Sequence, residues 1–131
     1  MRDVRSEDRC PCTSGMTFGE CCGPILSRDR RAPTAPALMR SRFTAFAVGD
    51  RDHLLATWHP GTQPAILELD DEIDWYRLDV TDTVAGGPFD DVGEVTFVAH
   101  YRAAAARRSM SEHSRFRRER GNWYYVDGDV A

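Results

Sequence analysis

The sequence has 131 residues, a formal net charge of −4 and 41% hydrophobic residues, which is enough for one modest core. It has no apolar run of about 18 residues and no apolar stretch typical of a signal peptide, so we expect neither a membrane span nor secretion, and a cytoplasmic location. All 17 basic residues are arginine, and the acidic net charge argues against general nucleic-acid binding.

The first feature along the chain is a cluster that contains every cysteine: Cys10, Cys12, Cys21 and Cys22. A disulfide framework usually joins distant parts of a secreted chain, and a bridge between neighbouring Cys21 and Cys22 would close a strained ring. An iron–sulfur cluster and a redox switch are alternatives. Four thiolates can surround zinc as a closed tetrahedron without an open coordination position. We therefore predict one structural Zn²⁺ held by these four residues.

The residues around the cysteines suit a small knuckle. Ser14 and Gly15 provide a turn, and Phe18 is the large apolar residue that could cover the metal. Arg9 or Arg28 could offset the thiolate charge. We assign 1–32 to the knuckle and a connector rich in Gly, Pro and Arg, and 33–131 to a globular domain.

Two helices are predicted at the start of this domain. Thr34 can cap the first helix and Gly49 can end it. Asp50 or Asp52 can cap the second, which Pro60 ends. Apolar residues recur at helical spacing in both segments: Leu38, Met39, Phe43, Phe46, Ala47, Leu54, Leu55 and Trp58. The pattern indicates a helical hairpin.

From Trp75 onward the apolar period changes to two, which is typical of half-buried strands. Turns are expected at 86–88 and 120–122, with strands around 109–118 and 123–127. The apolar residues of the first two strands alternate with polar ones: Tyr76, Leu78, Val80, Val95, Phe97, Ala99 and Tyr101. The fold class is therefore α+β, a curved antiparallel sheet forming a cone over the helical hairpin, preceded by the knuckle.

Charge is distributed unevenly along the predicted sheet. The segment 70–94 has nine acidic residues and one arginine, whereas 107–120 contains six arginines. The two segments could lie on solvated faces and neutralise each other in part, or the basic strand could dock an acidic partner.

The motif Cys10-Pro11-Cys12-Thr13-Ser14-Gly15, ending in Cys21-Cys22-Gly23-Pro24, resembles the SEC-C zinc knuckle of the SecA translocation ATPase. Four later segments of the sequence resemble the YchJ-type bacterial family: 35–43, Thr57-Trp58-His59-Pro60, 112–116 and 123–128. The resemblance implies a nuclear-transport-factor-2-like domain after the knuckle. It implies no particular activity. A SEC-C knuckle in SecA is associated with chaperone and ribosome contacts, which implies a translocation, chaperone or ribosome-related partner.

Four histidines and one glutamate are the candidates for chemistry inside the cone. His53 is expected to face solvent, and His59 to bond the last helical carbonyls. By strand alternation His100 and His113 point away from the core, whereas Glu112 shares the face of its apolar neighbours. A carboxylate there could act as a general base, or could form a buried ion pair with Arg40 or Arg42.

Two functional hypotheses follow. The leading one is an accessory protein whose knuckle docks a protein or nucleoprotein partner, with a second copy of the chain pairing through the exposed sheet face. The competing one is a small-molecule binder or enzyme that uses the cone, with Glu112 as acid/base and His59 or His113 assisting. An unpaired Glu112 beside an open cavity would favour the second hypothesis.

Overall fold

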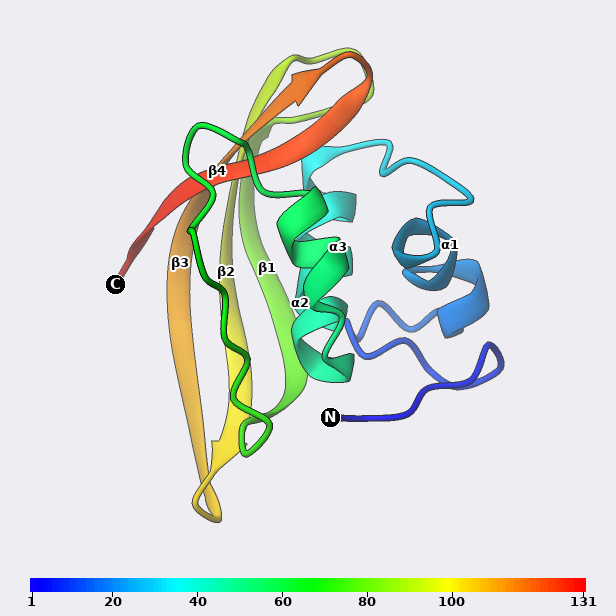
Figure 1. Ribbon diagram of the computed structural model, residues 1–131, viewed down its shortest axis with the longest axis vertical. Helices are drawn as coiled ribbons and strands as arrows, with labels where there is room; N and C mark the ends of the chain where they lie inside the picture. Colours follow the sequence, from blue (N-terminus) through cyan, green and yellow to red (C-terminus); the bar gives the residue numbers. More distant parts are fainter.

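The computed structural model describes residues 1–131 as a curved four-stranded sheet with the helices on its concave side (Figure 1). The helical elements are η1 (Phe18–Glu20), α1 (Gly23–Leu26), α2 (Ala35–Val48) and α3 (Arg51–Ala56). The strands are β1 (Asp74–Ala85), β2 (Val92–Ala103), β3 (Ala106–Glu119) and β4 (Asn122–Val130). None of the helices is both long and apolar enough to cross a membrane.

Both predicted helices are present, and their caps are confirmed. The Thr34 side chain accepts a hydrogen bond from Ala37 N at the start of α2, and Gly49 ends this helix with a φ of 80°. Asp50 caps α3 by accepting from His53 N. The second helix ends at Ala56, earlier than expected. The prediction of a connector after the last cysteine is wrong in part, because α1 begins directly after Cys22.

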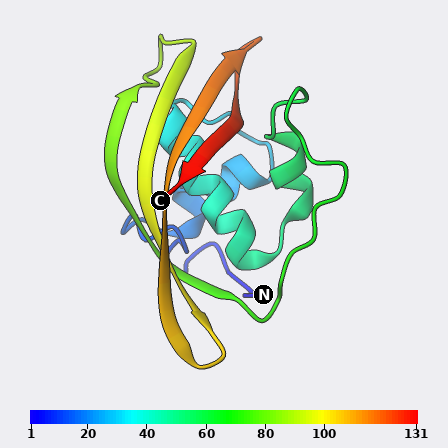
Figure 2. The ribbon, with the colours of Figure 1, turned by 90° about the vertical axis from the view of Figure 1, so that its left-hand side faces the viewer.

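The sheet is an antiparallel meander in the order β1-β2-β3-β4, which confirms the α+β fold class. The turn between β3 and β4 is formed by Arg120 and Gly121, both with positive φ, as tight hairpins require. Figure 2 shows the sheet curling around the helices on one side. The division into residues 1–32 and 33–131 stays a prediction.

Strand β1 departs from strict alternation near its start. The β1–β2 register shifts between Trp75 and Arg77, so that Tyr76 falls in a bulge. Tyr76 therefore lies beside His100 and under the guanidinium of Arg102 instead of facing the core with Leu78. The expectation for Tyr76 was wrong because a bulge, which the sequence pattern does not indicate, exchanges the faces of neighbouring residues.

A single core joins the knuckle to the cone. It contains three cysteines together with apolar residues of α1, α2 and the concave face of the sheet. Helix α2 is the central element, since it contacts α1, α3, β1, β2 and β4. The knuckle is thus part of the folded core rather than a flexible appendage.

The basic strand is partly neutralised by neighbouring acidic residues. Arg115 of β3 pairs with Asp127 and Asp129 of β4, and Arg118 pairs with Asp91 in the β1–β2 turn. These are exposed ion pairs, which contribute little stability individually. They support mutual neutralisation as one role of the arginines.

The expectation that His53 faces solvent was wrong. Its side chain is 3% exposed between α3 and α2, and its Nε2 lies 2.9 Å from Ser41 Oγ. Ser41 Oγ donates its proton to Leu38 O, so it accepts from His53 Nε2–H. Burial lowers the pKa of His53 to about 4, and the imidazole is neutral in the folded protein near pH 7.

This burial predicts a pH dependence of stability. Between pH 6.5 and 4 the unfolded chain protonates His53 while the folded chain does not, so the free energy of unfolding falls as the pH drops. His53→Gln retains a donor for Ser41 and removes the titration. Denaturant unfolding of both proteins, compared at each pH in the same buffer, should show a slope shallower by up to about 1.4 kcal/mol per pH unit in the variant. Equal slopes would contradict a neutral buried imidazole.

Candidate metal centre and cone cavity

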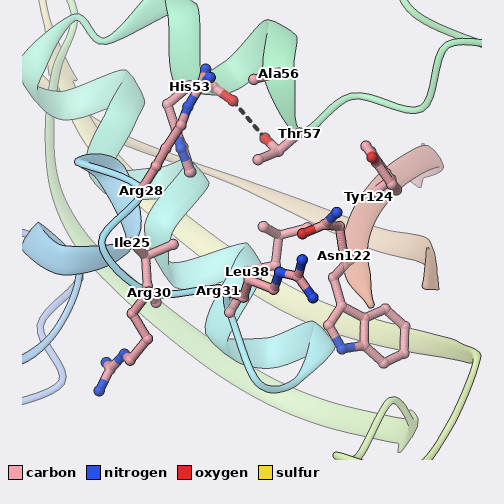
Figure 3. Close-up of a pocket in the computed structure, with 12 residues that line it drawn as sticks. Ile25, Arg28, Arg30, Arg31, Leu38, His53, Ala56, Thr57, Asn122 and Tyr124 are labelled. Carbon is pink, nitrogen blue, oxygen red and sulfur yellow. Dashed lines mark hydrogen bonds between the residues drawn. The ribbon is translucent and has the colours of Figure 1, made fainter. Parts of the chain in front are cut away.

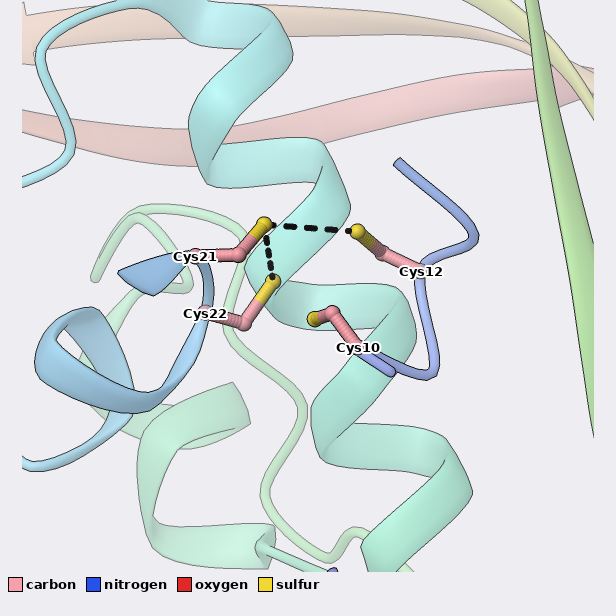
Figure 4. A group of neighbouring side chains, drawn as sticks. All are labelled: Cys10, Cys12, Cys21 and Cys22. Carbon is pink, nitrogen blue, oxygen red and sulfur yellow. Dashed lines mark hydrogen bonds between the residues drawn. The ribbon is translucent and has the colours of Figure 1, made fainter. Parts of the chain in front are cut away.

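The four cysteines converge from two short segments beside α2 (Figure 4). Cys10 and Cys12 come from the N-terminal loop, whereas Cys21 follows η1 and Cys22 precedes α1. Three of them are buried and Cys21 is partly exposed. All four are free thiols whose sulfur atoms lie within 4.8 Å of one another.

The spacing of the sulfur atoms fits a tetrahedral metal site. Cys12 Sγ and Cys22 Sγ lie 3.6 Å and 3.9 Å, respectively, from Cys21 Sγ. Four sulfur ligands at about 2.3 Å from zinc would be separated by about 3.8 Å. These distances are too long for disulfide bonds, which are about 2.05 Å. The residues therefore fit a metal ion bound by four cysteines.

The electrostatics of the cluster also favour a cation. Contacts with Cys10 and Cys22 lower the pKa of the Cys12 thiol, whereas the contact with Cys12 raises the pKa of Cys10 to about 11. Contacts with Cys10 and then with Cys12 raise the pKa of Cys22. One thiolate therefore keeps its neighbours protonated, because like charges at this spacing repel strongly in a buried site. A bound dication would allow all four thiols to ionise.

Hydroxyl groups complete the surroundings of the sulfur atoms. Ser14 Oγ lies 3.2 Å from Cys21 Sγ, and Thr44 Oγ1 of α2 lies 3.7 Å from Cys10 Sγ. The charge-offsetting role expected for Arg9 is not observed, since its guanidinium donates to Gly15 O. The contact with Thr44 was missed by the sequence analysis, because it joins residues 34 positions apart.

Hydrogen bonds of Thr13 and Arg40 fasten the knuckle to the globular domain. Thr13 Oγ1 accepts a hydrogen bond from Leu78 N of β1 at 3.1 Å. The Thr13 hydroxyl can donate its own proton to Cys12 O or to Leu78 O. Arg40 of α2 donates to Cys12 O at 3.0 Å. The backbone that presents Cys12 is therefore held between α2 and the outer edge of β1. Arg40 thus holds the backbone of the cysteine cluster and forms no hydrogen bond or ion pair with Glu112.

A cavity of about 280 Å³ lies between α2 and the concave face of the sheet, and Glu112 forms part of its wall. The expected position of Glu112 on the inner face is confirmed. Its Oε2 accepts hydrogen bonds from Tyr125 OH at 3.2 Å and from Ser114 Oγ. Arg42 lines the same cavity but makes no ion pair with Glu112. The buried ion pair considered as the alternative does not form.

The histidines considered as assistants do not reach Glu112. His59 Nε2 bonds Glu119, and its Nδ1 accepts from Gly61 N, so it does not bond the helical carbonyls as expected. His113 bonds Glu94 and Thr96 on the outer face of the sheet. His100, also on this face, bonds Asp79. None of these three histidines lines the cavity.

A second hollow, of about 300 Å³, opens between the connector, α3 and the start of β4 (Figure 3). Arg28, Arg30 and Arg31 of the connector line it together with Trp123. The guanidinium of Arg31 lies beside Asn122, whereas that of Arg30 points away from the other lining residues. All three arginines are exposed. This hollow is the basic part of the surface next to the knuckle.

Comparison with protein families gives two matches that together span most of the chain. Residues 34–128 match the middle NTF2-like domain of YchJ, and residues 8–24 match the SEC-C motif. A UPF0225 protein from Corynebacterium glutamicum is 54% identical over 122 residues, which are 93% of this chain and 97% of the relative. A UPF0225 protein from Corynebacterium efficiens is 52% identical over 123 residues, 94% of each chain.

Two solved structures share the fold. The solution structure of a SEC-C motif containing protein from Rhodopseudomonas palustris has a TM-score of 0.81 at 35% identity, covering 93% of this chain and 98% of that one. The crystal structure of a SEC-C motif containing protein from Psychrobacter arcticus has a TM-score of 0.78 at 24% identity, covering 96% and 84%. The second likeness concerns the fold alone.

The Thr13 contacts predict that one hydroxyl stabilises the attachment of the knuckle. Thr13→Ala leaves the Leu78 N–H without its partner, which should lower the free energy of unfolding by about 1–3 kcal/mol. Thr13→Ser keeps the hydroxyl and is the matched control. Denaturant unfolding under identical conditions measures both, and equal losses in the two variants would show that the methyl group, and not the hydroxyl, matters.

Proposed function

This chain belongs to the YchJ-type family, with a SEC-C motif before an NTF2-like domain, and we propose that it is a zinc-binding accessory protein whose knuckle docks a partner. The observation that carries the first part is the closed group of four free thiols, three of them in the core and Cys21 packed against it. Zinc is the proposed metal because its preferred geometry is a tetrahedron of thiolates. A site with four protein ligands has no position for substrate, so the ion would act structurally.

A structural ion would stabilise two parts of the molecule at once. Cys10 and Cys12 precede η1, whereas Cys22 directly precedes α1, so a shared ion would link the ends of the knuckle loop. The same loop is bonded to α2 and β1 through Cys12 O and Thr13. Metal binding would therefore stabilise the packing of the knuckle on the cone as well as the knuckle itself.

The docking part of the proposal is supported by the charges beside the knuckle. Arg28, Arg30 and Arg31 are exposed and form no ion pair within the chain. They lie around the hollow of about 300 Å³, whereas Arg115 and Arg118 of the sheet are already paired with carboxylates. Free guanidinium groups favour a partner that brings carboxylates. We therefore propose a protein partner with an acidic segment.

Metal analysis tests the zinc part. The protein purified under reducing conditions without chelators should contain about one equivalent of zinc by mass spectrometry, given the tight binding of four-cysteine sites. Cys22→Ser should lose the metal and unfold at lower temperature, because it removes a buried ligand. Met16→Ser, an exposed change in the same knuckle, should keep both. Less than about half an equivalent in the unaltered protein would refute the zinc site.

Quantitative affinity capture from bacterial lysate tests the docking part. A variant with Arg28, Arg30 and Arg31 changed to Ala should lose its partner, whereas a control with Arg77, Arg107 and Arg108 changed to Ala should retain it. Cross-links should map to an acidic segment of the captured protein. Capture that depends on RNA, judged by ribonuclease treatment, would indicate a nucleoprotein instead. Equal capture by both variants would contradict docking at this surface.

A further inference from the structure

The cavity in the cone has features of a ligand site that neither the metal centre nor partner docking explains. Its volume of about 280 Å³ is close to the lower end of the range for small-molecule pockets, about 300–1,000 Å³. Nine of its eleven lining residues are hydrophobic: Met39, Phe43, Phe46, Trp58, Trp75, Phe97, Ala99, Met110 and Tyr125. The remaining two carry opposite charges, Arg42 and Glu112. Most small pockets of this kind use a few fixed polar groups to orient an apolar ligand.

Arg42 is held rigidly in the wall of this cavity. Its side chain is only 3% exposed, and its Nη1 donates to Leu54 O and to Thr57 Oγ1, both at 2.8 Å. The guanidinium carbon lies 4.9 Å from the ring centre of Trp58 and 4.6 Å from that of Tyr125. Two hydrogen bonds and two aromatic rings thus fix the plane of the guanidinium, so little conformational entropy would be lost on binding.

The hydrogen bonds of Arg42 leave one edge of its guanidinium free. Both bonds come from Nη1, and Nε and Nη2 have no partner in the protein. Trp123 Nε1 is the one fully enclosed side-chain nitrogen or oxygen without a partner, so the free nitrogens of Arg42 are not fully enclosed, and Arg42 lines the cavity. The Nε and Nη2 protons point in parallel, which matches the two oxygens of a carboxylate.

Glu112 presents an acceptor to the same space. Its Oε2 is occupied by Tyr125 OH and Ser114 Oγ, whereas Oε1 has no partner in the protein. The carboxylate lies over Gly128 of β4, where a Cβ atom would come within 2.5 Å of Oε2. Burial and Glu112 raise the pKa of Tyr125, which keeps its hydroxyl protonated as a donor. The position of the Glu112 carboxylate is therefore fixed by its neighbours.

We propose that the cone cavity binds a small apolar zwitterion, a molecule of the α-amino acid type whose carboxylate meets the free edge of Arg42 and whose ammonium group meets Glu112. The two charged side chains line the same cavity and form no ion pair with each other, so each can pair with a charged group of a ligand. The apolar part of the ligand fills the aromatic space between α2 and the sheet.

Charge balance favours a zwitterion over an apolar carboxylate or an apolar amine as the ligand. Arg42 and Glu112 together contribute no net charge, so a zwitterion brings a partner to each charge and leaves none unpaired. An apolar carboxylate would satisfy Arg42 but approach the like charge of Glu112, and an apolar amine would do the reverse. Like charges in a low-dielectric cavity repel strongly, and unpaired buried charges are costly.

Isothermal titration of the full-length protein with three matched probes tests the inference. L-phenylalanine carries both charges, 3-phenylpropanoate only the carboxylate, and 2-phenylethylamine only the ammonium. We expect L-phenylalanine to bind at least about tenfold more tightly than either single-charge probe, which corresponds to about 1.4 kcal/mol. This comparison uses the unaltered protein, so it does not depend on whether a variant folds.

A conservative variant assigns the ammonium contact to Glu112. Glu112→Gln keeps the size of the side chain and an acceptor for Tyr125, but removes the charge. We expect its affinity for L-phenylalanine to fall about tenfold and its affinity for 3-phenylpropanoate to be unchanged or higher. Glu94→Gln, which makes the same charge change on the outer face beside His113, is the matched control and should bind all three probes as the unaltered protein does.

Two results would overturn the inference. One is the absence of L-phenylalanine binding up to about 10 mM, beyond which a specific small-molecule site has little meaning. The other is equal affinity for L-phenylalanine and 3-phenylpropanoate, which would show an apolar cavity that does not use Glu112. Neither result bears on the metal content or on partner capture, so this inference and the proposed function are tested separately.

Discussion

The placement of four sulfur atoms within 4.8 Å of one another, three in the core and one packed against it, is the constraint on which the N-terminal half of the structure depends. Such a cluster cannot ionise fully alone, because each thiolate raises the cost of the next. The loop that carries it is nevertheless bonded to α2 and β1, and α2 in turn contacts most of the sheet. The electrostatic state of the cysteines is therefore linked to the packing of the whole domain.

Much of the fold could be predicted from the sequence because the signals are local. Thr34 and Asp50 cap their helices through residues three positions away, and the turn at Arg120 and Gly121 involves adjacent residues. The family resemblance and the α+β fold class were confirmed for the same reason, since they rest on contiguous motifs and on apolar periodicity. The short spacing of the cysteines likewise predicts the cluster that the structure contains.

The remaining features depend on contacts between distant parts of the chain. His53 is buried because α3 packs it against Ser41, and Tyr76 faces outward because of a bulge that only the pairing with β2 reveals. Strand alternation placed Glu112 correctly, but its partners Ser114 and Tyr125 and the stacking of Arg42 on Trp58 required the assembled cone. One signal for Arg42 was available: it lies three residues after Met39 on the apolar face of α2.

The Thr13 contact has a consequence for behaviour at high protein concentration. β1 and β4 are the two edges of the sheet, and exposed edge strands can pair with other chains and nucleate aggregation. The backbone of Tyr125 in β4 is covered by Thr57 and His59, whereas Leu78 in β1 is covered by Thr13 of the knuckle. Detachment of the knuckle would uncover the β1 edge, so the N-terminal segment also protects the sheet against intermolecular strand pairing.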